Sequence, residues 1–419
     1  MRRAFRSLVA VAIISLASAC GGGSGGSAPA TGGISGGIAT PAPSPAPTPA
    51  PTPAAVTPAG YILTKTTAGA DDLIAGFDIA QGLQPSWGTG VVPGIYDPNE
   101  GAFRFVCGGD GALAKDDPLI YYKQPGAAHL HQVWGNADFT DSTTPQSLAA
   151  SNITNCNATP YSLNRSSYWM PVLLHDGGEA VLPDLVTVYY KRAKASSDYC
   201  NPNSPKFIGI CVGLPNQLRM IFGWDSSKPN AKVSGASWYC TGGTSQHYPD
   251  LDAVFASGCK AGDTLVGNTV APNCWDGKNL DSPDHRSHMA YADYARGDGL
   301  LHCPVTHPYL LPQEENKVMW TVTADMIGTR ADGSKYSRIR LSSDAMLAGS
   351  KPGETIHADY IEAWVGAAKK MWMDNCIDKG LDCSGGDLGN GKQLIGASQP
   401  TYGWVNPKPR VTWTGPGKT

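Results

Sequence analysis

The stretch LVTVYYKRA, residues 185–193, decides the fold class. It is rich in β-branched and aromatic residues, which is typical of a strand that packs against a hydrophobic core. Similar short runs recur along the chain, separated by clusters of Gly, Pro, Asn, Asp and Ser that favour turns. They predict a mainly β protein of the β-sandwich or jelly-roll type with long loops. The further strands are expected at AFRFVC (102–107), YWMPVLL (168–174), QLRMIFGW (217–224), VMWTVTADM (318–326) and SRIRLSS (337–343).

One segment predicts a helix packed against this β domain. It is HADYIEAWVGAAKKMWMDNC, residues 357–376, in which apolar residues recur every three or four positions. Asp359 would lie in the first turn, where a carboxylate interacts favourably with the helix dipole. The expected buried stripe consists of Ile361, Trp364, Val365, Ala368, Met371 and Trp372.

The first sixty residues predict export rather than folding. Residues 1–19 read as a signal peptide, with three arginines ahead of a short apolar run and small residues before the cleavage site. Cys20 stands in LASAC, which resembles a lipoprotein cleavage site, so we expect a lipidated Cys20; ordinary secretion is the alternative. Residues 20–60, rich first in Gly and Ser and then in Pro and Ala, would form a tether. Residues 61–419 would then form a single β-rich domain, lipid-anchored to the outer or cell-surface membrane and facing the periplasm or exterior.

The other ten cysteines predict up to five disulfides, as expected in an oxidising compartment. No C-x-x-C pair occurs, which argues against a zinc ribbon. Cys200 with Cys211, and Cys376 with Cys383, would each close a short loop. The remaining pairings stay open among Cys107, Cys156, Cys240, Cys259, Cys274 and Cys303.

The charge composition excludes one class of partner and suits another. The chain has 32 Lys and Arg against 35 Asp and Glu, a net charge of -3, and no basic stripe. This balance argues against nucleic-acid binding. Few charges combined with 50 glycines, 11 tryptophans and 17 tyrosines suit a secreted, loop-rich protein that binds carbohydrate.

Two of the nine histidines lie two positions apart in AHLHQVWGN, residues 128–136. In a strand, residues with this spacing point to the same face, with Cα atoms roughly 6.5–7 Å apart. His129 and His131 could therefore bind one metal ion or line one cleft; the alternative is polar packing. His357 and Asp359 are spaced in the same way, and a carboxylate near a histidine can fix its tautomer or complete a metal site.

A second cluster of ionisable residues lies in CWDGKNLDSPDHRSHMAYAD, residues 274–293. Its density favours a functional site; the alternative is a loop whose side chains cap its own backbone. A third group lies in HCPVTHPYLLPQEE, residues 302–315, where Pro308 holds the backbone of His307 extended. The members of the second cluster that we single out are Asp276, Lys278, Asn279, Asp281, Asp284, His285 and His288.

Taken together, DDPLIYYKQPGAAHLHQVWGN, SSYWMPVLL, CWDGKNLDSPDHRSHMAY, CPVTHPYLLPQ and HADYIEAW resemble a family of secreted proteins known as a domain of unknown function. Members occur in fungi, often fused to WSC carbohydrate-binding domains, and among bacterial exported proteins. The resemblance covers residues 100–375 approximately, and this chain differs in its predicted tether and its lack of a WSC module. It implies an extracytoplasmic location and a link to cell walls or polysaccharides. Besides the residues named above, Asp117, Asn136, Tyr168 and Trp169 match the family pattern.

Three functions stay open at this point. The first is a glycan hydrolase or lyase, with a cleft in which histidines and carboxylates are catalytic: His129, His131, Asp284, His285, His288, His307, His357 and Asp359. The second is a metal-dependent version, with zinc or copper bound by His129, His131, His357 and Asp359. The third is a non-catalytic protein that binds carbohydrate or the cell wall. Substrate contacts are expected at Asp117, Asn136, Trp134, Tyr168, Trp169, Trp275, Asp276, Lys278, Asn279 and Asp281.

A lipidated Cys20 as the mature N-terminus excludes the copper site that lytic oxygenases build on an N-terminal histidine. No nucleophile elbow, H-E-x-x-H motif or phosphate-binding loop competes with the histidine clusters. The expected partners are thus a polysaccharide or cell-wall glycan, and a membrane reached through the lipid anchor.

Overall fold

The structure of the chain is a computed structural model. It describes residues 55–86 without 59, 64, 65, 67 and 68, residues 97–156 without 110, and residues 161–242, 246–396 and 410–412. The predicted signal peptide, Cys20 and most of the tether lie outside these residues and stay predictions. Among the helices in the described ranges, none has the length and apolar character needed to cross a bilayer.

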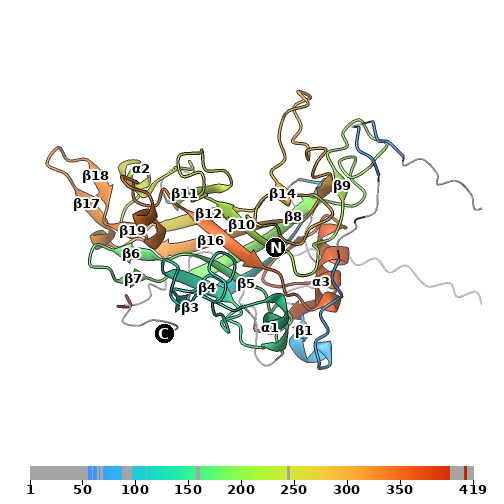
Figure 1. The fold of residues 1–419 in the computed structure, drawn as a ribbon, viewed down its shortest axis with the longest axis horizontal. Helices are drawn as coiled ribbons and strands as arrows, with labels where there is room; N and C mark the ends of the chain where they lie inside the picture. Colours follow the sequence, from blue (N-terminus) through green and yellow to red (C-terminus); the bar gives the residue numbers. More distant parts are fainter. Residues whose placement is uncertain are drawn as a thin grey trace, which may run out of the picture. The chain divides into compact units, whose positions relative to one another are not determined.

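A six-stranded sheet forms one layer of the domain (Figure 1). Its neighbouring strands are antiparallel, except for the last, which runs parallel to its neighbour. The stretch that opened the sequence analysis is β8, and it lies near the centre of this sheet. In spatial order the strands are β11 (Ala236–Thr241), β12 (Thr264–Val270), β16 (Gln313–Thr321), β8 (Leu185–Ala193), β2 (Glu100–Gly108) and β21 (Asp382–Cys383).

A five-stranded sheet forms the second layer, and all of its neighbouring strands are antiparallel. Its three central strands, β20, β5 and β4, are buried along their whole length. Both faces of this sheet are therefore covered in the middle. In order the strands are β10 (Arg219–Gly223), β20 (His357–Ile361), β5 (Ser167–Pro171), β4 (His131–Gly135) and β3 (Ala112–Ala114).

The two sheets pack face to face around an aromatic core. Phe105 of β2 lies 6.3 Å from Tyr168 of β5 between ring centroids. The Tyr168 hydroxyl is 2.8 Å from that of Tyr190 on β8, which donates to Tyr360 of β20 at 3.1 Å. These contacts join strands of both layers within one buried cluster. The predicted mainly β sandwich is confirmed.

Smaller elements complete the domain. The helices are α1 (Pro145–Ala150), α2 (Leu251–Ala256) and α3 (Gly366–Trp372), with single helical turns η1 (Ile79–Gly82), η2 (Ala324–Met326), η3 (Ser342–Met346) and η4 (Met373–Ile377). The short strands are β1 (Leu83–Pro85), β6 (Leu173–His175), β7 (Ala180–Val181), β9 (Ile210–Cys211), β13 (Cys274–Trp275), β14 (Met289–Ala290), β15 (Tyr309–Leu310), β17 (Ile327–Thr329), β18 (Lys335–Ser337), β19 (Ile339–Leu341) and β22 (Lys392–Leu394).

The predicted helix at 357–376 is partly wrong. Its first five residues form strand β20, and the packed helix α3 begins only at Gly366. All five residues 357–361 are buried, because both faces of this central strand are covered. A short strand buried on both faces shows no alternation, so periodicity does not distinguish it from a helix. His357 and Asp359 therefore lie on a strand, where their spacing directs them to one face.

Five disulfides brace the loops, as the ten cysteines predicted. Cys200–Cys211 and Cys376–Cys383 confirm the two predicted local bridges. The other three pairs join Cys107 with Cys156, Cys240 with Cys259, and Cys274 with Cys303. Cys274–Cys303 fixes both ends of the ionisable segment that follows β13, so the loop that borders the candidate site is anchored covalently.

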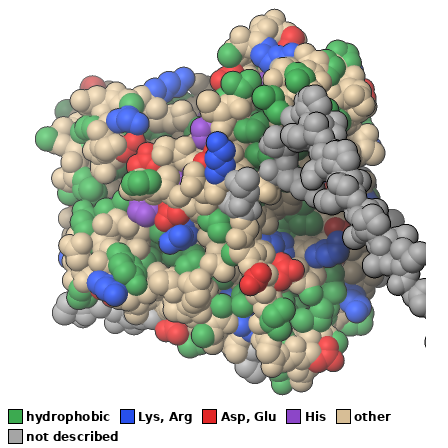
Figure 2. Space-filling model, turned by 45° about the vertical axis from the view of Figure 1, so that its right-hand side comes forward, with side chains coloured by type: hydrophobic (Ala, Val, Ile, Leu, Met, Phe, Trp, Pro, Cys, Tyr) green, Lys and Arg blue, Asp and Glu red, His purple; other side chains and the backbone are tan. Residues whose placement is uncertain are grey.

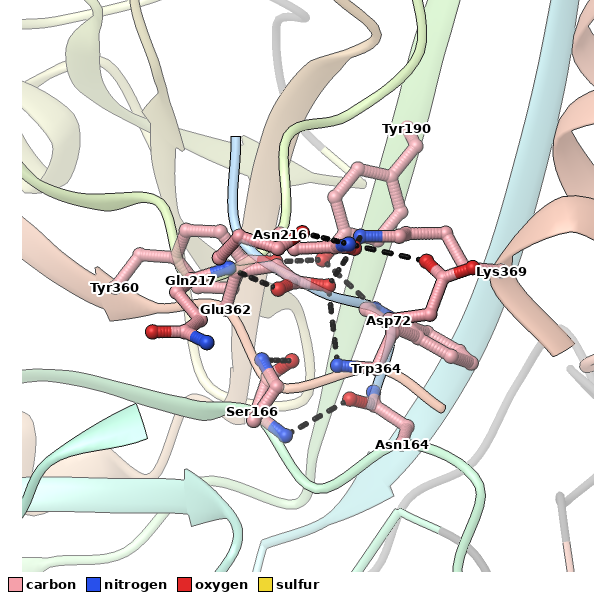
Figure 3. A network of polar contacts seen from close by, with 12 residues as sticks. Asp72, Asn164, Ser166, Tyr190, Asn216, Gln217, Tyr360, Glu362, Trp364 and Lys369 are labelled. Atoms are coloured by element: carbon pink, nitrogen blue, oxygen red, sulfur yellow. Dashed lines mark hydrogen bonds and ion pairs between the residues drawn. The ribbon is translucent and has the colours of Figure 1, made fainter. Parts of the chain in front are cut away.

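A buried ion pair anchors the end of β20 (Figure 3). Glu362 follows the strand directly, and its carboxylate lies 2.8 Å from the Lys369 ammonium of α3. The same carboxylate accepts the backbone N–H groups of Gln217 at 2.6 Å and Trp364 at 3.1 Å. Lys369 also donates to Asn216. The network therefore joins β20, α3 and the segment before β10.

Glu314 of β16 is a buried acid inside the sandwich. Its only hydrogen bond within the described chain is accepted from the Asn316 side chain at 2.9 Å, and its second carboxylate oxygen is buried without a partner. Burial raises the pKa of Glu314 to about 8, although the Asn316 hydrogen bond lowers it. The folded protein therefore holds a proton here that the unfolded chain loses near pH 4.5.

We expect Glu314→Gln to stabilise the protein increasingly as the pH rises. Because the folded-state pKa is raised, the wild-type free energy of unfolding falls between pH 4.5 and 8, by about 3 kcal/mol by pH 7. The glutamine variant does not titrate. Urea unfolding across this pH range should show a difference between variant and wild type that grows with pH.

The neighbouring Glu315 provides a control with the opposite sign. Its burial favours a raised pKa, but Lys191 and Lys317 outweigh it and hold the pKa below its usual value. Its contribution is therefore present above the unfolded pKa and is lost as the pH falls. Glu315→Gln should cost stability at neutral pH, and a pH-independent difference for Glu314→Gln would contradict its buried protonated state.

Candidate metal centre

Three histidines converge on the outer face of the five-stranded sheet. His131 is the first residue of β4, His129 precedes it by two positions, and His357 is the first residue of β20. The imidazole centroid of His129 lies 4.2 Å from that of His131 and 5.2 Å from that of His357. One nitrogen from each ring lies within 4.8 Å of the others. The His129–His131 pair singled out in the sequence thus meets His357 at one point.

The hydrogen bonds of these rings leave nitrogen lone pairs available. His131 Nδ1 lies 3.0 Å from the Asp116 carbonyl oxygen, and His357 Nδ1 lies 2.8 Å from that of Thr355. A carbonyl only accepts, so both Nδ1 atoms carry the proton and both Nε2 atoms carry a lone pair. Nε2 of His131, and that of His129, are buried and have no hydrogen-bond partner among the described residues. Buried polar atoms normally have partners, which points to a missing ligand.

Burial keeps the three imidazoles neutral. It lowers the pKa of His131 to about 3 and that of His357 to about 4. Burial also brings the pKa of His129 well below its usual value, and the charges that His131 and His357 would carry add to the effect. Neutral imidazole is the form that binds a metal ion.

Four carboxyl groups line the same cavity of about 170 Å³ as His129 and His357, those of Asp117, Asp225, Asp284 and Asp359. Asp359 lies two residues after His357 on β20, and one of its oxygens is buried without a hydrogen-bond partner in the described chain. Burial and the nearby Asp117 raise the pKa of Asp359 well above its usual value. Burial likewise raises the pKa of Asp117, although the backbone N–H groups of Ile120 and Leu119 oppose this. The cavity therefore combines neutral nitrogen donors with two carboxyl groups of raised pKa, Asp117 and Asp359, and two of lowered pKa, Asp225 and Asp284.

The donor set fits a metal that prefers imidazole. Three neutral histidines with an open position are a known arrangement for catalytic zinc, with Zn–N bonds of about 2.0–2.1 Å. The three nitrogen atoms lie within 4.8 Å of one another, close enough to approach one ion. The second group of possible ligands, Cys240, Cys259 and Asp263, does not fit, because its two cysteines form a disulfide.

A tight turn after β13 forms the opposite wall of the cavity. Asp284 accepts hydrogen bonds from the backbone N–H groups of Arg286 and Ser287 at 3.1 and 2.8 Å. These bonds hold the pKa of Asp284 far below its usual value against the effect of its limited burial. Arg286 donates to the Trp224 carbonyl at 2.7 Å and lines the cavity. Asp284 therefore shapes the turn that positions Arg286.

The other histidines that were predicted to be catalytic form hydrogen bonds or ion pairs outside the three-histidine cluster. His285 pairs with Asp281 at 2.7 Å, and that carboxylate lies 3.4 Å from Arg219. His288 is buried between Ser282 and the Arg219 carbonyl. His307 contacts the Ser287 carbonyl at 3.0 Å. These three rings support the turn and do not join the three-histidine cluster.

Several residues that were predicted to bind substrate instead stabilise a turn or lie buried in the core. Asp276 caps its own turn by accepting from the backbone of Lys278 and Asn279 at 2.8 and 2.9 Å, and Lys278 is exposed. Five others are at most 2 % exposed and cannot offer a face to a sugar, which corrects the expectation of substrate contacts at these residues. They are Trp134, Asn136, Tyr168, Trp169 and Trp275.

Sequence reasoning missed part of the cavity wall. Tyr121 and Arg286 line it, although neither was singled out. Arg286 lies between the two histidines of SPDHRSH, so it belongs to a segment that the sequence analysis had singled out. The sequence pattern does not indicate, however, whether such an arginine lines a cavity or faces solvent. On the face shown in Figure 2, histidine contributes two small areas of surface, both beside acidic side chains.

The fold and the site define a disulfide-braced β-sandwich protein with a cluster of three histidines on the outer face of one sheet. Two of them, His129 and His357, line the cavity beside the cluster, which we call the three-histidine cavity. The chain belongs to the family described as Domain of unknown function (DUF1996), whose model matches residues 117–364. That range contains all three histidines, Asp117 and Asp359. No curated protein and no solved structure matches the chain.

Proposed function

We propose that the protein is an extracytoplasmic metal-dependent enzyme that cleaves glycans, with zinc bound by His129, His131 and His357. The observation that carries the proposal is the convergence of three neutral imidazoles, two of which have buried nitrogen atoms without partners. Hydrogen bonds to the carbonyls of Asp116 and Thr355 orient two of the rings. Such bonds are typical of histidines that bind metals.

The chain itself would supply the acid–base chemistry beside the metal. A zinc ion polarises a substrate oxygen and lowers the pKa of a bound water to about 7. Asp359, whose pKa is raised by burial and by Asp117, would donate a proton to the leaving-group oxygen. Arg286 would orient the sugar ring from the wall formed by the turn after β13.

The proposed glycan substrate and the proposed extracytoplasmic location rest on the composition, the disulfides and the predicted signal peptide, and not on the histidine cluster. Low charge, many aromatic residues and five disulfides suit an exported protein that meets polysaccharides. The predicted signal peptide and lipidated Cys20 would place the domain outside the cytoplasm, on a tether. A cavity of about 170 Å³ suits one sugar unit or substituent at a time.

Metal analysis joined to glycan digestion tests the proposal. The purified chain should retain close to one zinc ion per molecule, and it should release products from at least one cell-wall polysaccharide. Chelation should abolish release and zinc should restore it. Copper in place of zinc, with activity dependent on a reductant and oxygen, would replace the hydrolytic proposal by an oxidative one. Product release that survives complete metal removal would contradict both.

A further inference from the structure

A second, larger cavity lies at one end of the six-stranded sheet, away from the histidines. Its volume is about 410 Å³, within the range of about 300–1,000 Å³ typical of ligand pockets. Glu100 of β2, Lys191 of β8 and Gln313 of β16 reach it from three neighbouring strands. None of the residues that line it lines the three-histidine cavity. It is therefore a separate feature built on the other sheet.

The polar groups around this cavity are only partly satisfied by the protein. Within the described ranges, the Glu100 carboxylate has no hydrogen-bond or ion-pair partner, although the residue is half-buried. The side-chain amide of Asn99 and the hydroxyl of Tyr199 also lack a hydrogen bond to any described residue. These polar atoms are not among the buried ones, so they are accessible from the cavity to a ligand that both donates and accepts hydrogen bonds.

The charges point to a neutral ligand. Lys191 and Lys317 share the Glu315 carboxylate at 2.9 and 3.3 Å, and Arg192 is paired with Asp378. These three cations face four acids, since Asp97 and Glu100 join Glu315 and Asp378, so the cavity has no excess of positive charge for an anion. Apolar side chains such as Ile208 and Leu310 supply the rest of the wall. Mixed carboxylate, amide, hydroxyl and apolar groups of this kind suit the hydroxyls and C–H faces of a sugar.

We propose that this cavity is a binding site for neutral glycan chains, separate from the metal centre. Glu100 accepts hydrogen bonds from two sugar hydroxyls, and Asn99 and Tyr199 hold neighbouring hydroxyls. The site needs no metal and performs no chemistry. It would keep the domain on its polymer while the three-histidine cavity acts, but its binding stands whether or not that proposed function is correct.

Binding measurements on the purified chain test the proposal. Neutral hexasaccharides of β-1,4-glucose, β-1,3-glucose and N-acetylglucosamine are titrated by calorimetry, with an oligogalacturonate as the acidic probe. At least one neutral oligomer should bind, and the acidic one should not. Glu100→Ala should weaken binding by at least tenfold. Glu100→Gln should weaken it less, because the amide keeps one acceptor.

Two controls separate this site from the metal centre. His131→Asn should bind the same oligosaccharide unchanged, and so should the wild type after chelation. Glu354→Ala removes another half-buried acid, one that lies outside the cavity, and should have no effect. The proposal is overturned if no neutral oligomer binds saturably, if the acidic oligomer binds instead, or if Glu100→Ala retains full affinity while keeping its melting temperature. Loss of binding in His131→Asn alone would assign the oligosaccharide to the three-histidine cavity.

Discussion

His131→Asn should lose the metal while keeping the fold. His131 is fully buried at the start of β4, and its Nε2 has no hydrogen-bond partner in the described part of the chain. Asparagine keeps an amide N–H that can replace Nδ1 in the bond to the Asp116 carbonyl, but it removes the imidazole ligand. Loss of an outer hydrogen-bond partner of a metal ligand costs about 10–100-fold in affinity, so loss of a ligand should cost more than about 100-fold. Competition with a zinc-binding dye measures this change.

His288→Asn provides the matched control for this variant. His288 is also buried and hydrogen-bonded at both nitrogens, but it supports the turn after β13 and is not part of the three-histidine cluster. It should retain zinc affinity within a few-fold, even if its melting temperature falls. Equal loss of zinc from both variants would mean that buried histidines in general, rather than this cluster, hold the metal.

Lys369→Met should destabilise the protein by about 3–5 kcal/mol. The lysine and Glu362 side chains are only 7 % and 2 % exposed, so the variant leaves a buried carboxylate without its cation. The two backbone N–H groups that Glu362 accepts offset only part of this loss. Because Glu362 follows β20 directly, the strand that carries His357 and Asp359 should loosen at this end. Chemical unfolding measures the change.

Two further variants make the Lys369 result specific. Lys370→Met removes the neighbouring lysine, which is 74 % exposed and pairs with Asp374, and should change stability by less than about 1 kcal/mol. Glu362→Gln combined with Lys369→Met removes both charges and should recover much of the loss. A loss in Lys369→Met no larger than that in Lys370→Met would show that the ion pair contributes little.

The sequence predicted the sandwich because its strands carry a local signal. LVTVYYKRA forms β8 with the predicted bounds, since strand propensity and alternating burial agree there. The start of β20 was mistaken for helix because HADYI is buried on both faces and shows no alternation. The registers that place β4, β5 and β20 side by side depend on contacts far apart in the sequence, which no local pattern contains.

The candidate site shows the same division. The His-x-His and His-x-Asp spacings predicted pairs that share a face of a strand, and the structure brings those pairs together. The spacing of the histidines in SPDHRSH indicated a functional site equally well. In the structure they form hydrogen bonds to Asp281, Ser282 and the Arg219 carbonyl and thereby support a turn. The buried tryptophans were taken for binding surfaces because sequence does not report which aromatic residues face the core.

X-ray absorption spectroscopy of the zinc-loaded chain tests the central claim most directly. The zinc edge reports the number and type of ligands without requiring a known substrate. The three-histidine centre predicts three imidazole nitrogens at about 2.0–2.1 Å and one oxygen, and a spectrum of His131→Asn that has lost an imidazole. A spectrum with sulfur ligands, with fewer than three imidazoles, or unchanged in His131→Asn would contradict it.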